Sequence, residues 1–384
     1  MKVLHLSAGN LYGGVETILT TLARLRDLAP EMEPEFGLCF HGRLWDELAA
    51  AGVPVRDLSR VRFSRPWTVV RAQRRLASLL ATGRYDVVVC HMSWVQALFG
   101  GVARRYGPGF VAYFHGPRTG GWLEWLAGRH RPGLVIGPSR HTVDSYRPLF
   151  PGVRAEVFYA PIPPHVVEAP ELRPEERAAI RRQFGAGPGD VVILQASRIE
   201  SWKGPDLALR ALARLRDVPG WQFWLAGGVQ RPSEQPFYDL LRRIVSEGGI
   251  ATRVRFLGQR SDVARLMRAA DLYCQGNRGP EGFSLSFLEA SYCGLPIITT
   301  DLGGAAEMID PQTGILVPPG EDVTGLADAL RSVLFDRDRR TAMACRAREK
   351  AVLLSDGCQQ LRRLAGLLAS TGQLKPATQP REGR

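Results

Sequence analysis

Short apolar runs alternate along this chain with longer segments of helical periodicity, and this alternation limits the folds that the chain can adopt. Each run has the length of one buried strand, and the segments between runs are long enough to cross over a sheet. Such an order predicts an α/β protein with doubly wound parallel sheets, which bind ligands at the carboxyl ends of their strands. We expect strands at residues 3–7, 87–91, 110–114, 135–137, 191–196, 222–226, 254–257, 272–274 and 297–300.

Two domains are expected, because 384 residues exceed what one hydrophobic core normally holds. A proline-rich stretch at 159–164, followed by a charged segment to Gly189, marks the linker between them. We therefore expect an N-terminal domain over 1–165 and a C-terminal domain over 166–354. The tail over 371–384 is polar, with two prolines and a basic end, so we expect it to be disordered.

The composition is that of an ordinary globular protein, with 45% apolar and 23% charged residues. The chain contains no run of about 18 uncharged apolar residues, so no transmembrane helix is expected. Its first seven residues are typical of a buried strand and not of a signal peptide. The six cysteines lie far apart without a CxxC pair, so we expect reduced thiols in a cytoplasmic protein, with neither disulfide bonds nor a metal site.

Residues 281–289, with the sequence EGFSLSFLE, place two carboxylates at an expected loop-to-helix junction. Gly282 lets the backbone approach a ligand, and Ser284 or Ser286 is a candidate helix cap. The first turn of this helix would present free amides to an anion, with Glu281 beside the anion and Glu289 farther along the axis. That arrangement suits a nucleotide-sugar, which has a diphosphate between two groups rich in hydroxyls. The alternative is an ordinary amphipathic helix with two exposed glutamates.

This stretch and the residues after it, as far as Glu307, resemble the glutamate-x7-glutamate signature of the retaining glycosyltransferases of the GT4 family, which have the GT-B fold. The resemblance is strong over 191–320 and moderate over 1–14 and around His115. It implies two Rossmann-like domains that face each other across a cleft, with the acceptor in the N-terminal domain and the nucleotide-sugar in the C-terminal domain. It also implies that a helix over 355–370 crosses back to the N-terminal domain.

A basic pair follows the expected strand at 191–196. Arg198 can make a bidentate contact with phosphate oxygens, and Lys203 adds a compact second charge. The resemblance assigns both to the donor diphosphate, Glu281 to the sugar hydroxyls and Glu289 to the ribose, whereas a solvated basic loop is the alternative for the pair. The expected donor-binding residues are Gly13, Gly14, Arg198, Lys203, Gly227, Phe256, Leu257, Gly282, Phe283, Ser284, Leu285 and Glu289.

The first half of the chain supplies a glycine-rich loop at 7–16, which follows a strand and opens a helix. Its spacing does not fit GxGxxG, so a nicotinamide cofactor is not expected, and the resemblance places Gly13 and Gly14 against the diphosphate. The resemblance also places His115 near the transferred sugar, and a buried structural histidine is the alternative.

Acceptor-side residues are expected at three further positions of the first half, His91, Ser139 and Arg140. His91 follows one strand and would line the acceptor side. Ser139 and Arg140 follow another strand, and a contact with donor or acceptor and a helix cap both remain open for them.

The resemblance implies transfer with retention of the anomeric configuration. No acidic residue is an obvious nucleophile on the opposite face of the sugar, so we favour front-side displacement, in which the leaving diphosphate accepts the proton of the acceptor. The protein would stabilise charge on the leaving group without a metal or another cofactor. Asp336 and Asp338 superficially resemble a DxD metal motif but lie in a charged helical stretch, so we interpret them as surface residues. The expected catalytic residues are His115, Glu281, Arg198 and Lys203.

Two positions depart from the family pattern. The loop at 275–280 is longer than usual, and Ser284 stands where glycine is common. The sugar pocket can therefore differ in shape, and the sequence does not predict the transferred sugar.

The net charge of +12 lies mostly in the first 165 residues, which hold 20 lysines and arginines against 12 acidic residues. Two basic, partly aromatic segments there could touch an anionic membrane or a lipid-linked acceptor, and the alternative is a pair of amphipathic helices packed on a sheet. The segments comprise Arg60, Arg62, Arg65, Trp67, Arg71, Arg74 and Arg75, and then Trp122, Leu123, Trp125, Leu126, Arg129 and Arg131.

The sequence thus predicts a cytoplasmic retaining glycosyltransferase that moves a sugar from a UDP- or GDP-linked donor to a glycan, glycolipid or other hydroxyl acceptor, in bacterial polysaccharide or glycolipid biosynthesis. Peripheral contact with the inner face of an anionic membrane stays open. Alternatives are a nonhydrolysing sugar-nucleotide epimerase and a nucleotide-sugar binding protein without transfer activity. A glycan phosphorylase would need a pyridoxal-phosphate lysine, and Lys203 is better explained as a diphosphate ligand. No nucleic-acid-binding motif accompanies the positive charge, so no nucleic-acid partner is expected.

Overall fold

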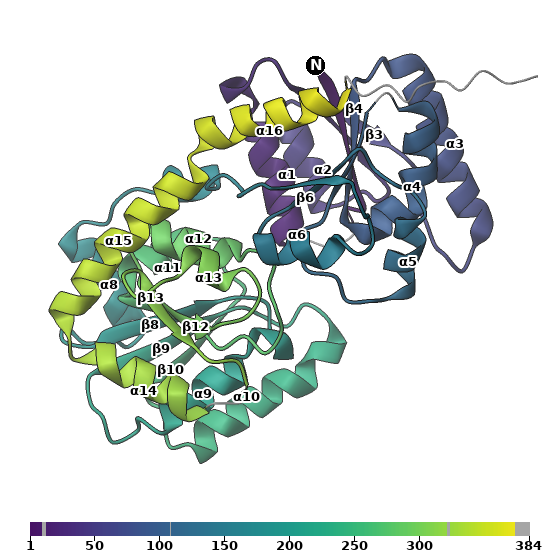
Figure 1. Cartoon of the computed structure of the whole chain (residues 1–384). Coiled ribbons are helices and arrows are strands. Elements are labelled where there is room, and N and C mark those ends of the chain that lie inside the picture. The colour runs from purple at the N-terminus through teal and green to yellow at the C-terminus, as the bar shows by residue number, and fades with distance from the viewer. Residues whose placement is uncertain (10–12, 108, 321–322, 373–384) are drawn as a thin grey trace, which may run out of the picture. The chain divides into compact units, whose positions relative to one another are not determined.

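The computed structural model describes residues 1–9, 13–107, 109–320 and 323–372. The chain forms two compact units, unit 1 (Met1–Pro161 with Gly357–Arg384) and unit 2 (Ile162–Asp356), as Figure 1 shows. Each unit is built on one parallel sheet with helices packed against it. The prediction of an α/β protein with two Rossmann-like, doubly wound sheets is therefore confirmed.

In the sheet of unit 1, strands are added first on one side of β1 and then on the other. Seven parallel strands form it, β1 (Lys2–Ser7), β2 (Glu33–Leu38), β3 (Val55–Asp57), β4 (Val87–His91), β5 (Phe110–Tyr113), β6 (Leu134–Gly137) and β7 (Arg154–Val157). Their order is β3-β2-β1-β4-β5-β6-β7, so the winding reverses between β1 and β4. Doubly wound sheets bind ligands outside the carboxyl ends of the strands at such a reversal.

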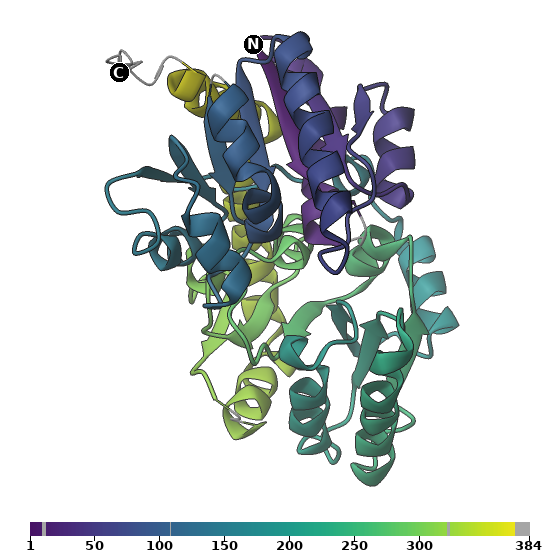
Figure 2. The same ribbon diagram turned by 90° about the vertical axis from the view of Figure 1, so that its right-hand side faces the viewer.

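Helices cover both faces of this sheet, which Figure 2 shows from the side. Leu19 and Ala23 pack with Phe36 on one face, and Leu76 and Phe99 pack with strand residues on the other. The first face carries α1 (Gly14–Arg24) and α2 (Arg43–Ala50), and the second carries α3 (Pro66–Gly83) and α4 (Met92–Tyr106). The other helical segments are η1 (Arg26–Leu28), α5 (Trp122–Gly128), α6 (Arg140–Tyr146) and α16 (Gly357–Gly372), and α16 packs on η1, β4 and β5.

Unit 2 repeats this plan with six parallel strands, β8 (Val191–Ala196), β9 (Trp221–Ala226), β10 (Val254–Gly258), β11 (Leu272–Gln275), β12 (Ile297–Thr300) and β13 (Gly314–Val317). Their order is β10-β9-β8-β11-β12-β13, so the winding reverses between β8 and β11. The helical segments are α7 (Pro164–Val167), α8 (Pro174–Gln183), η2 (Ser201–Lys203), α9 (Pro205–Ala213), η3 (Pro232–Glu234), α10 (Gln235–Glu247), α11 (Val263–Ala269), α12 (Leu285–Tyr292), α13 (Ala305–Met308), α14 (Val323–Leu334) and α15 (Arg337–Ser355).

Every predicted strand corresponds to a strand of the structure, but β2, β3, β7 and β13 were not predicted. Strand β2 could not be recognised in the sequence, because the buried residue Glu35 interrupts its apolar run. Glu35 is buried at no great cost, since it contacts the Lys2 amine at 2.7 Å and the Arg56 guanidinium at 3.0 Å and accepts a 2.6 Å hydrogen bond from the Tyr85 hydroxyl. The other three strands are short edge strands, and β3 and β7 also contain the charged residues that are common at sheet edges.

Two expectations near the C-terminus are corrected. The last crossing helix begins at Gly357, after α15 has ended at Ser355, and it continues to Gly372. It therefore includes the first two residues of the tail expected at 371–384, and the rest of that tail, 373–384, lies outside the described residues. Asp336 caps α15 by accepting a 2.9 Å hydrogen bond from the Arg339 amide, which explains one half of the DxD pattern.

The described residues include no helix that is long and apolar enough to cross a membrane. The six cysteines are free thiols. Cys39, Cys90 and Cys274 are buried, whereas Cys293 is partly exposed.

Candidate active site

The carboxyl ends of β8 and β11, where the winding of unit 2 reverses, carry a cluster of polar side chains. Lys203 and Glu281 form an ion pair there, although 78 residues separate them in the sequence. Their side chains are only 12% and 13% exposed, so the pair is largely removed from water. Two of the predicted catalytic residues thus contact each other directly.

The second carboxylate oxygen of Glu281 is also satisfied. It accepts hydrogen bonds from the Gln275 amide at 3.2 Å and from the Asn277 amide at 3.0 Å. Gln275 ends β11, and Asn277 lies in the loop that departs from the family pattern. Neither residue was predicted from the sequence to belong to the site, because neutral amides carry no recognisable signal without their partners.

Lys203 is held in place from several sides. The side-chain amide of Gln195, at the end of β8, donates to the Lys203 carbonyl at 3.2 Å. The Lys203 amine lies 4.2 Å from the ring centre of Trp202, a distance that favours a cation–π contact. These contacts fix a compact positive charge at the strand ends, where a phosphate would need it.

Arg198 lies in the same loop but is more exposed. Its guanidinium contacts Glu200 at 3.0 Å, and the other oxygen of Glu200 accepts a 2.8 Å hydrogen bond from the Trp202 indole. The arginine side chain is 37% exposed, so it can turn toward an arriving anion at modest cost. Glu200 was missed in the sequence, where it resembled an ordinary loop residue.

Two glycines allow the loops of this cluster to approach one another. Gly204 has a φ of +59°, and a Cβ atom there would lie 1.6 Å from the Gly276 carbonyl oxygen. Gly303 has a φ of +69°, and a Cβ atom there would lie 2.1 Å from the Glu281 carbonyl oxygen. That same carbonyl accepts a 2.9 Å hydrogen bond from the Gly304 amide. The backbone of Glu281 therefore rests against Gly303 and Gly304.

Helix α12 begins at Leu285, with Ser284 in the capping position. The Ser284 side chain does not cap the helix and instead lies 2.9 Å from the Ser286 hydroxyl, so the predicted serine cap is wrong. Gly282, Phe283 and Ser284 are buried where the loop enters the helix, and Leu285 is partly exposed.

Glu289 lies within α12 in a different environment from Glu281. Its side chain is 13% exposed and lies 3.8 Å from the His165 ring, and no hydrogen-bond donor to it is found in the part of the chain that the structure describes. Burial without such donors raises the pKa of Glu289 to about 7. The protein thus holds one carboxylate already satisfied, Glu281, and one that still needs donors, Glu289.

The remaining donor-side predictions of unit 2 lie at the carboxyl ends of β9 and β10. The Gly227 amide donates to the Gly258 carbonyl at 2.9 Å, which joins the loops after these two strands. Phe256 and Leu257 belong to β10 and are partly exposed. These residues share the strand-end edge with Lys203 and Glu281 without touching them in the described contacts.

Unit 1 carries the other predicted residues. Gly13 precedes α1, and its amide donates to the Glu16 carboxylate at 2.9 Å, while Gly14 is the first residue of that helix. The loop residues just before them, 10–12, lie outside the described residues. His91 and His115, at the ends of β4 and β5, are joined by a 2.8 Å hydrogen bond between their rings. His91 is fully buried, so its ring does not line a surface that an acceptor could touch.

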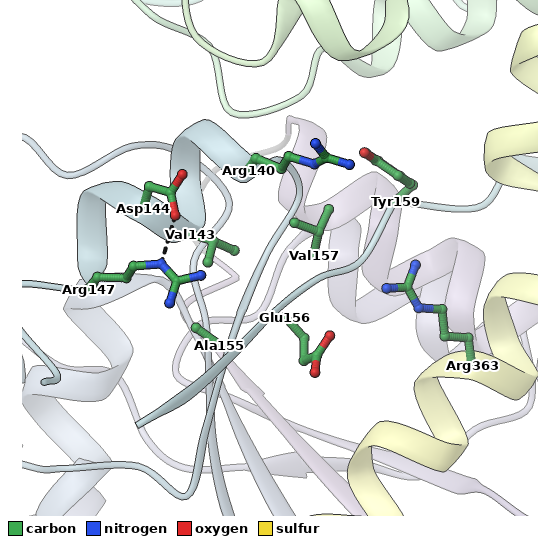
Figure 3. Close-up of a pocket in the computed structure, with 9 residues that line it drawn as sticks. All are labelled: Arg140, Val143, Asp144, Arg147, Ala155, Glu156, Val157, Tyr159 and Arg363. Atoms are coloured by element: carbon green, nitrogen blue, oxygen red, sulfur yellow. Dashed lines mark hydrogen bonds and ion pairs between the residues drawn. The ribbon is translucent and has the colours of Figure 1, made fainter. Parts of the chain in front are cut away.

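Ser139 and Arg140 have separate positions. Ser139 is fully buried and caps α6 by accepting a 3.1 Å hydrogen bond from the Thr142 amide. Arg140 lines a cavity of about 480 Å³ in unit 1, and Figure 3 shows its guanidinium near the Tyr159 hydroxyl. The cavity is lined by Arg140, Val143, Asp144, Arg147, Ala155, Glu156, Val157, Tyr159 and Arg363.

The two carboxylates of this cavity are already paired with arginines. Asp144 contacts Arg147 at 2.7 Å, and Glu156 contacts Arg154 at 2.9 Å. With Arg140 and Arg363, the lining has three arginines against these two acidic residues. The cavity therefore suits an anionic group.

The loop after His115 is fixed by an acid that was not predicted from the sequence. Glu124, in α5, accepts hydrogen bonds from the Thr119 amide at 2.9 Å and the Gly120 amide at 2.6 Å. It is only 6% exposed. A glutamate a few residues after a Thr-Gly-Gly turn is a weak signal in sequence, but here it sets the conformation of the strand-end loop.

Comparison with known proteins identifies the family. The family described as "Glycosyltransferase Family 4" matches residues 12–166, and the family described as "Glycosyl transferases group 1" matches residues 176–350. A GDP-mannose-dependent alpha-(1-6)-phosphatidylinositol monomannoside mannosyltransferase of Mycolicibacterium smegmatis is 33% identical over 304 residues, which cover 73% of this chain and 75% of that protein. The chain belongs to the GT4 family of glycosyltransferases.

Other relatives agree with this assignment. A D-inositol 3-phosphate glycosyltransferase of Nocardia farcinica is 36% identical to this chain over 186 residues. These residues cover 46% of this chain and 40% of the length of that protein. The crystal structure of Anabaena Alr3699/HepE in complex with UDP and glucose has a TM-score of 0.81 and 25% identity, and covers 96% of this chain and all of that one. These similarities confirm the predicted GT-B fold.

Glu289→Gln should make the glycosyltransferase more stable in alkaline solution. The pKa of Glu289 in the folded protein, about 7, lies above its value in an unfolded chain. The native state therefore binds this proton more tightly, and the free energy of unfolding should fall as the pH rises from about 4.5 to 7, by about 3 kcal/mol at most. Glutamine does not titrate, so the free energy of unfolding of the variant should not fall for this reason. Urea unfolding should show it to be more stable than wild type at pH 8 and similar at pH 4.5, and an equal difference at both pH values would contradict the assignment.

Gly303→Ala should displace the Glu281 loop of the glycosyltransferase. Gly249→Ala is the matched control, because Gly249 has a φ of +67° but a Cβ atom there would meet no heavy atom within 4 Å. Both variants pay the strain of a left-handed alanine, about 1–2 kcal/mol, but only the first forces two backbone segments apart. We expect transfer activity to fall at least tenfold more in Gly303→Ala than in Gly249→Ala. Equal losses of activity and of thermal stability would show that the Glu281 backbone tolerates the shift.

Proposed function

We propose that this enzyme moves a hexosyl group from a UDP- or GDP-linked sugar to a hydroxyl group of a phosphate-bearing acceptor, with retention of the anomeric configuration. The observation that carries the proposal is the ion pair of Lys203 and Glu281 at the strand ends at which unit 2 reverses its winding. The relatives support both nucleotides, because one is named for GDP-mannose and the Anabaena structure contains UDP.

The donor contacts follow from the chemistry of these side chains. Lys203 and Arg198 bind the diphosphate and stabilise the negative charge that develops on it as the sugar leaves. They supply positive charge at the position where a metal ion would otherwise be needed, so we propose a metal-independent reaction without a cofactor. Glu289 accepts hydrogen bonds from the ribose hydroxyls, which supply the donors that its carboxylate lacks.

The environment of Glu281 favours front-side displacement. A carboxylate that already accepts bonds from Lys203, Gln275 and Asn277 is a weak nucleophile, because its charge is stabilised. We therefore assign Glu281 to the sugar hydroxyls and not to a covalent intermediate. The leaving diphosphate then accepts the proton of the attacking hydroxyl, and His115 in unit 1 hydrogen-bonds the transferred sugar.

An acceptor that carries phosphate fits the arginine-lined cavity of unit 1. Arg140 of α6, Arg147 just after that helix and Arg363 of α16 line one hollow of about 480 Å³. Two relatives are named for inositol 3-phosphate and for phosphatidylinositol monomannoside, and both of these molecules carry a phosphate. We place such an acceptor, a polyol phosphate or a glycolipid, on the unit 1 side of the reaction.

Nucleotide binding tests the donor site. Wild-type protein with excess EDTA should bind UDP or GDP, and Glu289→Gln should bind at least tenfold more weakly, since it loses charged hydrogen bonds to the ribose. Glu247→Gln, an exposed acid of the same unit, is the control and should bind like wild type. Calorimetry measures both affinities, and NMR of the product reports the anomeric configuration.

Each of the other outcomes has a defined meaning. Failure of wild type to bind either nucleotide would contradict the donor site. Release of a free epimeric sugar without an acceptor would identify an epimerase, and an inverted product would exclude the front-side mechanism.

Unit 1 also presents an aromatic and basic surface that suits an anionic membrane. Trp67, Trp122 and Trp125 are 66%, 63% and 61% exposed. The Phe63 ring, in the loop just before α3, packs edge-on against Trp122 of α5 at 5.7 Å, so the aromatic surface extends from α5 to that loop. Arg71, Arg74 and Arg75 lie beside Trp67 along α3, whose opposite side packs in the core. We propose a cytoplasmic enzyme that docks here on anionic lipid, where indole rings and arginines are favourable.

Vesicle binding checks this surface. Wild type should sediment with phosphatidylglycerol vesicles at low salt, and the double variant Trp122→Ser and Trp125→Ser should partition at least tenfold less, because it loses two interfacial anchors. Phe335→Ser is the control, since Phe335 is 65% exposed in unit 2. Equal partitioning of all three proteins would show that the surface does not bind membranes.

A further inference from the structure

Two fully buried amide side chains lie next to the carboxylate of Glu281 in unit 2. Gln275 is the last residue of β11, Asn277 lies in the loop that follows, and both residues are 0% exposed. The Nε2 atom of Gln275 lies 3.2 Å, and the Nδ2 atom of Asn277 lies 3.0 Å, from the Glu281 oxygen Oε2. The Lys203 amine contacts the other oxygen, Oε1. The two oxygens of one carboxylate are therefore held by different kinds of group.

The carboxylate determines how the two amides are turned. An ionised carboxylate can only accept hydrogen bonds, so each amide must present its NH2 group to Oε2. The amide oxygen of Asn277 then accepts from Nε2 of Gln275 at 2.8 Å, and the amide oxygen of Gln275 accepts from the Tyr273 hydroxyl at 3.1 Å. Every one of these contacts pairs a donor with an acceptor. The ion pair with Lys203 therefore fixes the orientation of both amides.

The backbone that carries the amides is held by the neighbouring strand. The Thr299 hydroxyl donates to the Gln275 carbonyl at 2.6 Å, and the Thr300 hydroxyl donates to the Asn277 carbonyl at 2.5 Å. Both threonines lie at the end of β12. A buried polar network whose members are satisfied is rigid. Gln275 and Asn277 are thus held at both ends, by β12 through their backbone and by Glu281 through their amides.

The oxygen Oε1 of Glu281 is the one with room for a further donor. A carboxylate has about four lone-pair positions, two on each oxygen, and the buried amides take both positions on Oε2. On Oε1, the Lys203 amine takes one position and leaves the other. The side chains of Lys203 and Glu281 are 12% and 13% exposed, so this charged pair is partly open to solvent although the amides are not.

We propose that Gln275 and Asn277 are positioning residues, which occupy Oε2 of Glu281 and so leave Oε1, beside Lys203, as the oxygen that accepts a hydroxyl group of the donor sugar. This assignment rests on the proposed function, in which Glu281 binds the sugar. The two amides touch no substrate. They act by fixing the direction of a carboxylate that a flexible glutamate side chain would otherwise not hold.

The affinity for a nucleotide-sugar, compared with that for its nucleoside diphosphate, tests this role. Calorimetry with UDP-glucose, UDP-galactose, UDP-N-acetylglucosamine and GDP-mannose first identifies the donor that wild type binds most tightly. Asn277→Leu should bind that donor about tenfold more weakly, because Glu281 is no longer directed at the sugar. Its affinity for the matching UDP or GDP should stay within about threefold of wild type, because Glu281 does not bind the nucleotide. Gln222→Leu, at a buried amide of β9 in the same unit, is the control and should change neither affinity.

A double variant shows whether Asn277 acts through Glu281. Glu281→Gln alone should weaken nucleotide-sugar binding, and Asn277→Leu should weaken it little further in that background, because the carboxylate that it positions is gone. Additive effects of the two substitutions would overturn the positioning role. So would equal losses of affinity for nucleotide-sugar and nucleoside diphosphate, or no loss at all in Asn277→Leu. If Asn277→Leu fails to fold, Gln275→Met removes the other donor to Oε2 and carries the same expectations.

Failure of the proposed function gives a different result. If Glu281→Gln binds the nucleotide-sugar like wild type, or if wild type binds none of the four donors, Glu281 has no sugar to recognise and the positioning role fails with it. If Glu281→Gln binds weakly and Asn277→Leu binds like wild type, the sugar contact of Glu281 stands and only the role of the amides is wrong.

Discussion

The ion pair of Lys203 and Glu281 is the interaction on which the candidate donor site depends. Two charges that are largely removed from water are tolerated only if each finds partners, and loss of one partner from such a pair typically costs about 3–5 kcal/mol. The surrounding structure meets this requirement with the amides of Gln275 and Asn277 and with glycines that let three loops come together. The same requirement keeps a positive charge ready at the strand ends before any ligand arrives.

The two units carry different kinds of side chain at the carboxyl ends of their strands. Unit 2 places charged groups at its reversal, Lys203 and Glu281, with Glu289 nearby as an acid of raised pKa. Unit 1 places neutral histidines at its reversal, and Arg140, Arg147 and Arg363 line a separate cavity. Charged groups suit an anionic diphosphate, whereas neutral rings suit the hydroxyl groups of a sugar. In the proposed function, the two units therefore recognise different ligands with the same doubly wound plan, through the residues at their strand ends.

The sequence predicted the features that depend on local pattern. Apolar runs identified nine strands, and a glutamate pair with a recognisable spacing pointed to Glu281 and Glu289. It did not predict β2, because Glu35 is buried only through partners from three other segments. Gln275, Asn277 and Glu124 were missed for the same reason, since a neutral amide or a loop acid gains its role only from the residues that it contacts in the fold. The prediction of a serine cap was wrong because the hydroxyl groups of Ser284 and Ser286 hydrogen-bond to each other. Capping propensities alone do not show which of two competing hydrogen bonds a serine side chain makes.

Unit 1 is not continuous in the chain, because α16 supplies its last helix after the whole of unit 2. Leu361, Leu364 and Leu368 of that helix are buried, so the first 161 residues leave part of their apolar surface uncovered until the final helix has been made. At ordinary rates of translation, the ribosome needs roughly 10–40 s to synthesise the intervening segment. During that interval the nascent N-terminal part must stay soluble while incomplete, which makes it a natural client for chaperones that act on the ribosome.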